Sequence, residues 1–206
     1  MHDLARVFFG RVRNLPQRGR NKSAQGRAER YSAQRRPGLS DHADPKPCKG
    51  GTWSVIMSQS LAKNLLHLVF STKHRSLWIP DTVRQRLYAY QGGIFKEWDS
   101  PALAIGGVDD HVHVLFSLSK NHALIKIVEE VKKGSSKWMK REGTGNADFY
   151  WQNGYAAFSV SQSNVEAVKR YIENQEEHHR KMTFQDELRI LLERHRVEFD
   201  ERYVWD

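Results

Sequence analysis

The order in which short apolar runs alternate with amphipathic segments is the feature of this sequence that most constrains its fold. Four apolar runs predict β-strands, at residues 65–72, 102–108, 111–118 and 155–160. Segments with helical periodicity predict α-helices, at about residues 80–98, 123–140, 163–181 and 183–196. The resulting order, β-α-β-β-α-β-α-α, predicts an α+β fold in which an antiparallel β-sheet carries helices packed on it.

Two local signals set boundaries within this pattern. The residues GGVDD at 106–110 lie between the second and third predicted strands and predict a hairpin connection. Ser163 is followed three residues later by Glu166, which predicts a capping box at the start of the third helix.

The first 56 residues differ in composition from the rest of the chain. They hold 12 Lys and Arg against 4 Asp and Glu, so their balance of 12 − 4 = +8 accounts for most of the net charge of +9 of the 206 residues. They also contain four of the six prolines and show no sustained period, which predicts disorder. Three explanations are open: a phosphate-binding tail, an Arg-rich targeting peptide, or a stretch read from a misassigned start codon. We favour the last, in which a single working domain runs from Met57 to Asp206.

Composition also excludes several classes of protein. No run approaches the roughly 18 apolar residues of a membrane span, and the N-terminus lacks the apolar core of a secretory signal. The single cysteine, Cys48, rules out a disulfide framework and a cysteine zinc cluster. We therefore expect a soluble cytoplasmic protein with no membrane segment.

The charge of the remaining part is unevenly distributed. Residues 120–141 hold seven Lys and Arg against two Glu, whereas residues 173–206 hold ten acids against six Lys and Arg. A nucleic-acid surface should therefore lie near the middle stretch, although lysines on a solvated helix face are an equally simple explanation. The candidate DNA-binding residues are Lys73, Arg75, Lys132, Lys133, Lys137 and Lys140. Tyr150 and three other aromatics of residues 138–155 are candidates for stacking on unpaired bases, with core packing as the simpler alternative.

The residues with most chemical information are His111, Val112 and His113. Residues two apart in a strand point to the same face, so both imidazoles should project side by side while Val112 faces the core. Two neighbouring imidazoles suit a divalent metal whose further ligands come from elsewhere in the fold. The His-x-His pattern is weak by itself, because histidines that are merely packed or exposed give the same pattern.

The third predicted helix carries a second polar pair. Tyr171 and Gln175 are four residues apart and should present a hydroxyl and an amide oxygen on one helix face. By spacing alone, a half-buried tyrosine above a solvated glutamine is the better explanation. Asp110 and His179 have weaker claims as residues that support a metal site, because acids are common in turns and histidines near helix ends are common on surfaces.

Taken together, these motifs resemble a known family. The run HLVFSTKHR at residues 67–75, the HUH motif (His, hydrophobic, His) in DDHVHVLFSLS, and YIENQ at residues 171–175 follow one another in the order seen in single-tyrosine HUH transposases. This family is typified by the IS-two-hundred-like insertion sequences and the REP-associated tyrosine transposases. The resemblance covers residues 57–206 and does not extend to the first 56 residues.

The resemblance implies a fold, a site and partners. The fold is that of HUH nucleases, an antiparallel sheet of the ferredoxin-like or RRM-like kind. His111, His113 and Gln175 would be ligands of Mg2+ or Mn2+, and Tyr171 would be the nucleophile that cleaves single-stranded DNA through a 5′-phosphotyrosine. Recognition of hairpins at the element's ends and a homodimer are further expectations, although REP-associated relatives can be monomeric.

Three alternatives compete with this interpretation. A metal hydrolase of the metallo-β-lactamase type would need a further Asp-His after His113, where Val114 and Leu115 stand instead. A replication initiator or relaxase shares the chemistry, but the compact length and the HUH-before-tyrosine order favour a transposase. A protein that binds DNA or RNA hairpins without catalysis is the alternative from another class, and the presence of all four expected site residues argues against it.

Overall fold

The computed structural model describes residues 60–205 as one folded unit. The expectations for residues 1–56, including disorder and the alternative start at Met57, lie outside the described residues. Among residues 60–205, no helix has the length and apolar character needed to cross a bilayer.

Four strands form one antiparallel sheet. They are β1 (Asn64–Ser71), β2 (Ala102–Gly107), β3 (His111–Leu118) and β4 (Ala156–Ser159), in the spatial order β2-β3-β1-β4. All three neighbouring pairs are antiparallel. Two split β-α-β units, β1-α2-β2 and β3-α3-β4, generate this ferredoxin-like order. The predicted α+β class and its antiparallel sheet are confirmed.

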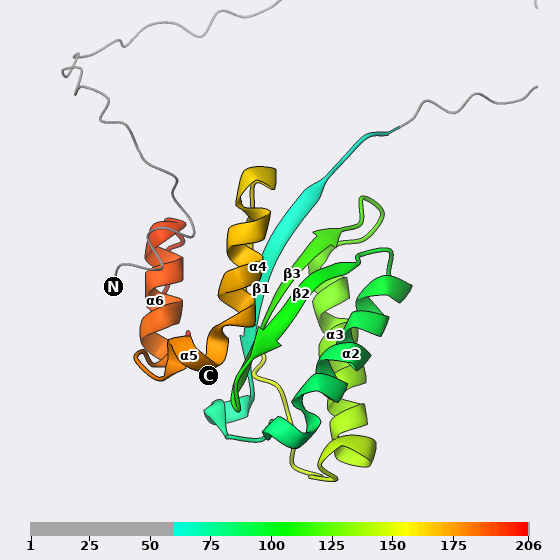
Figure 1. Cartoon of the computed structure of the whole chain (residues 1–206), viewed down its shortest axis with the longest axis vertical. Coiled ribbons are helices and arrows are strands. Elements are labelled where there is room, and N and C mark those ends of the chain that lie inside the picture. Colours follow the sequence, from blue (N-terminus) through cyan, green and yellow to red (C-terminus); the bar gives the residue numbers. More distant parts are fainter. Residues whose placement is uncertain (1–59, 206) are drawn as a thin grey trace, which may run out of the picture. The chain divides into compact units, whose positions relative to one another are not determined.

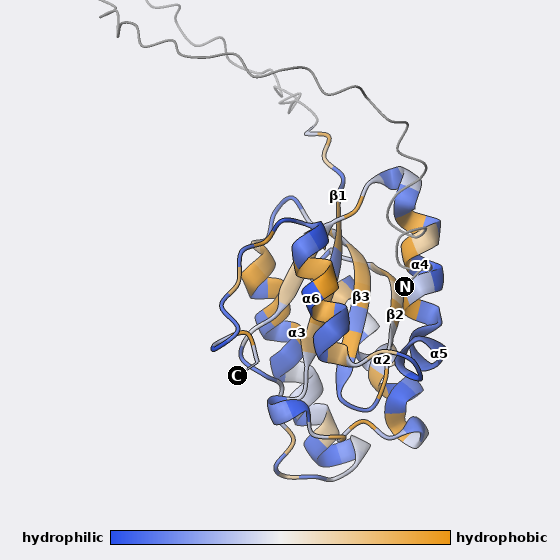
Figure 2. Ribbon diagram, turned by 90° about the vertical axis from the view of Figure 1, so that its left-hand side faces the viewer, coloured by the Kyte–Doolittle hydropathy of each residue, from blue (hydrophilic) through white to orange (hydrophobic). Residues whose placement is uncertain are grey.

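Helices cover both faces of the sheet (Figure 1). Helices α2 (Asp81–Glu97) and α3 (Leu124–Trp138) pack on the face formed by alternate residues of the central strands. These residues are Leu68, Phe70, Val112, Val114 and Phe116. The strands are coloured mainly as hydrophobic in Figure 2, and α2 and α3 each combine hydrophobic and hydrophilic residues. The larger apolar core therefore lies between the sheet and α2 and α3.

The opposite face is covered by the C-terminal helices. They are α4 (Val165–Glu173), α5 (Gln175–His179) and α6 (Phe184–Arg194). Their apolar residues pack on Leu65, Val69, Leu115 and Phe158 of the sheet. Since period-2 alternation places His111 and His113 on this same face as Leu115, both imidazoles are enclosed between the sheet and the C-terminal helices.

The third predicted helix is divided in the structure. A 3-10 turn, η3 (Gln162–Asn164), precedes α4, and Asn174 (φ −99°, ψ 22°) separates α4 from α5. The expected capping box is wrong, because Ser163 lies inside η3 and its hydroxyl is 2.9 Å from that of Ser161. The second predicted helix also ends early, at Trp138, and continues as a π-helical turn, η2 (Met139–Gly143). A further 3-10 turn, η1 (Lys73–Arg75), follows β1.

A glycine sets how closely α4 approaches the sheet. Gly106 of β2 pairs with His113, and a Cβ atom added to it would lie 2.2 Å from the carbonyl oxygen of Ile172 in α4. This distance is far below van der Waals contact, and the obstacle is backbone that cannot rotate away. Only glycine at this position lets α4, with Tyr171 beside Ile172, lie directly against the sheet.

We expect the substitution Gly106→Ala to lower the free energy of unfolding by about 1–3 kcal/mol, because the added methyl forces α4 away from β2. Gly93→Ala is the matched control, because no atom lies within 4 Å of its Cβ position and alanine favours a helix by about 0.5–1 kcal/mol over glycine. Urea unfolding of both variants tests this prediction. Equal free energies of unfolding would show that α4 moves away from β2 without loss of stability.

Candidate functional site

Strand β3 presents two buried imidazoles, and in each ring one nitrogen is in hydrogen-bond contact with another side chain. His111 and His113 are both fully buried. The Nδ1 of His111 lies 2.6 Å from Oδ1 of Asp110, and the Nδ1 of His113 lies 2.9 Å from Nε2 of His67 on β1. Among the described residues, neither Nε2 has a hydrogen-bond partner. This is the arrangement found at metal sites, where a second group holds the ring and the free nitrogen faces the ion.

Tyr171 in α4 and Gln175 at the start of α5 lie on either side of the break between these helices, close to the imidazoles. The ring of Tyr171 stands edge-on to the ring of His113, with centroids 5.8 Å apart, and to that of His67 at 6.0 Å. Gln175 is 1% exposed, and among residues 60–205 its Oε1 has no hydrogen-bond partner. The predicted HUH and YIENQ motifs therefore meet in one site, although 60 residues separate His111 from Tyr171.

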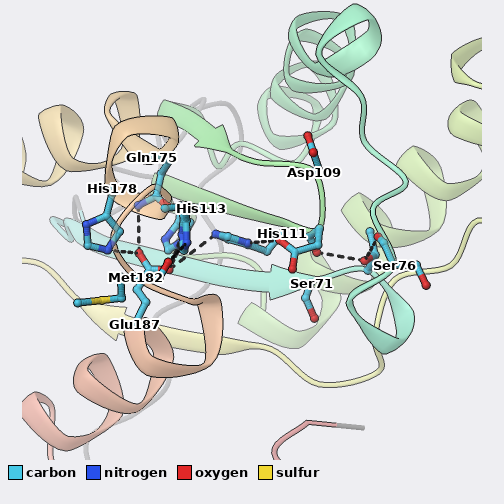
Figure 3. A network of polar contacts seen from close by, with 12 residues as sticks. Ser71, Ser76, Asp109, His111, His113, Gln175, His178, Met182 and Glu187 are labelled. Carbon is cyan, nitrogen blue, oxygen red and sulfur yellow. Dashed lines mark hydrogen bonds and ion pairs between the residues drawn. The ribbon is translucent and has the colours of Figure 1, made fainter.

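Glu187 of α6 lies at the centre of this site. Its side chain is fully buried and points from α6 toward His113, Gln175 and His178 (Figure 3). Oε1 accepts hydrogen bonds from the Tyr171 hydroxyl and, at 3.1 Å, from Nε2 of Gln175. The Nε2 of His178 is 3.5 Å from the same oxygen.

The other carboxylate oxygen faces three imidazoles. Oε2 of Glu187 lies 3.1 Å from Nε2 of His179, 3.3 Å from that of His113 and 3.7 Å from that of His111. Each of these four residues offers one potential ligand atom, and the four atoms all lie within 4.8 Å of one another. The four residues therefore form a cluster that can hold one metal ion.

Burial and the Glu187 carboxylate shift the titration of the site. Burial raises the pKa of Tyr171 well above its ordinary value, and the nearby Glu187 raises it further, so the phenol keeps its proton at neutral pH. Burial also works against ionisation of Glu187, but His113, His179 and His111 outweigh it and hold the pKa of Glu187 well below its ordinary value. Burial lowers the pKa of His113 despite this carboxylate. For His179, the hydrogen bond to Glu187 outweighs burial and raises the pKa.

The donor set fits a divalent metal. The Nε2 atoms of His111 and His113 face Oε2 of Glu187 at 3.7 and 3.3 Å, and among the described residues the buried amide oxygen of Gln175 has no hydrogen-bond partner, which is costly unless another group satisfies it. Imidazole nitrogens together with carboxylate or amide oxygens suit a transition metal such as Mn2+ better than Mg2+, which prefers oxygen ligands.

Sequence reasoning missed Glu187 and His67. A signal for Glu187 was available, because it lies on the apolar face of α6, between Phe184 and Leu188. His67 also interrupts the apolar run of β1. A charged residue on the buried side of an amphipathic helix requires a partner, and the sequence alone does not identify which one.

The candidate DNA-binding residues fall into two groups. Lys73 and Arg75 belong to η1, which Thr72 connects to Ser71, the residue that pairs with His111 at the end of the sheet. The four lysines of residues 132–140 lie on or just after α3, which packs on the opposite face of the sheet. Lys133, Lys137, Lys140 and Tyr150 line a groove of about 650 Å³ beside α3. The Nζ of Lys140 lies 3.4 Å from the centre of the exposed Tyr150 ring.

Lys132 differs from its neighbours because it holds a loop in place. Its Nζ donates to the carbonyl oxygens of Gln152 at 2.8 Å, Asn153 at 3.3 Å and Gly154 at 2.6 Å. Burial lowers the pKa of Lys132 to about 8. Its ammonium group also lies over the rings of Phe70 and Tyr155. These contacts assign Lys132 a structural role in the segment that leads into β4.

We expect Lys132→Met to lower the free energy of unfolding by about 1–2 kcal/mol, because three carbonyl groups lose their shared donor. The exposed Lys133→Met should change it by less than about 0.5 kcal/mol. Thermal unfolding followed by circular dichroism compares the two variants. Equal losses would remove the structural role assigned to Lys132.

Known proteins are similar to this chain. Residues 60–175 match the family model described as "Transposase IS200 like". A protein from Deinococcus radiodurans R1, described as a candidate transposase, has a solved structure with 24% identity and a TM-score of 0.45, covering 58% of this chain and 98% of that chain. The solved structure of a REP-associated tyrosine transposase bound to a REP hairpin has 16% identity and a TM-score of 0.46, covering 60% of this chain and 74% of the other. No curated protein matches the sequence.

Proposed function

Because the chain belongs to the IS200-like transposase family, we propose that it cleaves and rejoins single-stranded DNA through a covalent bond to Tyr171. The observation that carries this proposal is the position of the Tyr171 ring, edge-on to His113 in the cluster of buried imidazoles. A nucleophilic hydroxyl beside a potential metal site is the arrangement that phosphodiester cleavage requires.

The proposed reaction exchanges one phosphate ester for another. The Tyr171 oxygen attacks phosphorus and forms a 5′-phosphotyrosine, while the bond from phosphorus to the 3′-oxygen breaks. The phenol gives its proton to solvent, and the departing oxygen takes one up to become a 3′-OH. A 3′-OH of another strand can then attack the phosphotyrosine and rejoin DNA without ATP, because the ester bond was conserved.

The residues around Tyr171 prepare this attack. Its raised pKa means that the phenolate, the better nucleophile, is disfavoured in the protein alone. A Mg2+ or Mn2+ ion held by His111, His113 and Gln175 would offset the charge of the phosphate and of the developing phenolate. Asp110 and His67 hold the two imidazoles through their Nδ1 atoms, so that each Nε2 faces the site.

We assign the α3 groove to single-stranded DNA next to a hairpin. Lys133, Lys137 and Lys140 supply positive charge for phosphates, and the exposed face of Tyr150 supports stacking of an unpaired base. Lys73 and Arg75 extend this positive charge toward the His111 end of the sheet. Recognition of hairpins at the element's ends is part of the same proposal.

The oligomeric state is a separate part of the proposal. In this structure Tyr171 lies beside the imidazoles of its own chain. A homodimer, in which tyrosine helices are exchanged between subunits, stays our prediction from the family resemblance, and light scattering of the purified protein tests it.

We expect Tyr171→Phe to abolish covalent attachment to DNA while leaving reversible hairpin binding within about twofold, because the change removes only the nucleophilic oxygen. The full chain is incubated with labelled single-stranded hairpin oligonucleotides from the gene's own flanks, with Mn2+ or with EDTA, and resolved under denaturing conditions. The wild type should give an adduct only with the metal.

Tyr88→Phe is the matched control, since Tyr88 is a buried tyrosine of α2, on the other side of the sheet. Reversible binding without an adduct in the wild type would refute catalysis and favour the hairpin-binding alternative.

We expect Tyr150→Ala to weaken binding of single-stranded DNA about tenfold, because one stacked base is worth roughly 1–3 kcal/mol. Tyr203→Ala serves as the control for loss of an exposed aromatic outside the groove. Fluorescence anisotropy at fixed salt measures both affinities, and equal values would remove the groove from the DNA interface.

A further inference from the structure

We propose that Glu187 and His179 are additional ligands of the metal site, and that Glu187 ties the nucleophile Tyr171 to that site. This inference rests on the proposed function for the role of Tyr171. Both residues lie beyond residue 175, where the match to the family model ends, so they come from the part of the chain that the family model does not cover.

The spacing of the ligand atoms is the first argument. Neighbouring ligands that surround one ion at about 2.1 Å lie about 3.0 Å apart in an octahedron and about 3.4 Å apart in a tetrahedron. Oε2 of Glu187 lies 3.1, 3.3 and 3.7 Å from the Nε2 atoms of His179, His113 and His111. These separations match the edges of a ligand shell around a shared ion.

Burial of the carboxylate is the second argument. The side chain of Glu187 is fully buried between the sheet and the C-terminal helices, where a carboxylate is costly unless a positive charge lies beside it. A divalent cation among the imidazoles would supply that positive charge.

The orientation of the imidazoles is the third argument. The Nδ1 of His179 donates a hydrogen bond to the carbonyl oxygen of Met182 at 2.9 Å, so this ring is held on its far side like those of His111 and His113. Three rings are thus each fixed through Nδ1 while their Nε2 atoms converge on one carboxylate oxygen. Rings held in this way are typical of metal ligands.

The two oxygens of Glu187 have separate partners. Oε2 belongs to the imidazole cluster, whereas Oε1 accepts hydrogen bonds from Tyr171 and Gln175. Glu187 is therefore a positioning residue for the nucleophile as well as a ligand, and its removal should affect both metal affinity and cleavage.

The experiment measures Mn2+ binding to the DNA-free full chain by isothermal titration calorimetry. We expect Glu187→Gln to weaken Mn2+ binding at least about tenfold, because the amide loses the charge that the ion pairs with, and to abolish most of the rise in melting temperature that Mn2+ causes. Glu193→Gln, an exposed residue of the same helix, should leave Mn2+ affinity within twofold.

His179→Asn provides a second variant at a position nearer the surface, in case Glu187→Gln does not fold. We expect it also to weaken Mn2+ binding at least about tenfold. Circular dichroism of each metal-free variant establishes that it is folded before titration.

The outcomes separate this inference from the proposed function. If His113→Asn or Gln175→Ala weakens Mn2+ binding while Glu187→Gln and His179→Asn do not, the additional ligands are refuted and the HUH site stands. If His113→Asn also leaves Mn2+ affinity unchanged, both the inference and the metal-dependent reaction are wrong. Weakened binding in both the Glu187 and the His179 variants supports the inference.

Discussion

The organisation of the site depends on one buried carboxylate, that of Glu187. Burying a charge is costly unless other groups compensate for it, and here the compensation comes from three separate parts of the fold. Strand β3 supplies His111 and His113, the segment around α5 supplies Gln175 and His179, and α4 supplies the Tyr171 hydroxyl. The position of α6 is therefore coupled to that of every residue proposed to act in cleavage.

The two faces of the sheet have different roles, one in the apolar core and the other in the candidate site. Val112, Val114 and Phe116 of β3 enter the apolar core under α2 and α3, whereas His111 and His113 of the same strand face α4 to α6. An eight-residue strand can do both because its side chains alternate between faces. A shift of one residue in its pairing with β1 would exchange the two sets, so the apolar core also fixes where the imidazoles point.

A buried arginine connects the two layers at the edge of the site. Arg84 of α2 is 6% exposed and forms ion pairs with Asp109 in the β2-β3 connection and, at 2.5 Å, with Glu176 of α5. It therefore links the core helix to the segment just before His111 and to the helix that carries Gln175 and His179. Both partners are half-exposed or exposed, so these ion pairs contribute little to stability. Their role is to fix the positions of the connected segments relative to α2.

Much of the fold was predictable from sequence, because each strand and the long helices have a clear period. The HUH pair on one strand face and the α+β class follow directly from alternation and element order. The break at Asn174 was not predictable, because residues 163–181 keep a helical pattern through it. The family resemblance named Tyr171, His111, His113 and Gln175, and the structure brings all four together. Glu187 was missed because its partners are distant in sequence, and only the packing of α6 on the sheet reveals them.

Access to the nucleophile imposes the last constraint on the mechanism. Tyr171 is 7% exposed and lies in the same apolar layer as Phe184 and Leu188 of α6, which a charged phosphate does not enter without cost. The proposed cleavage therefore requires a movement that exposes the phenol. The helical geometry is interrupted at Asn174, between Tyr171 and Gln175, so we expect the movement to separate the end of α4 from α5. Such a shift would break the hydrogen bond from Tyr171 to Oε1 of Glu187 and would not involve the contacts of Oε2 with the imidazoles. The proposed nucleophile would then reach DNA while the proposed metal ligands keep their positions.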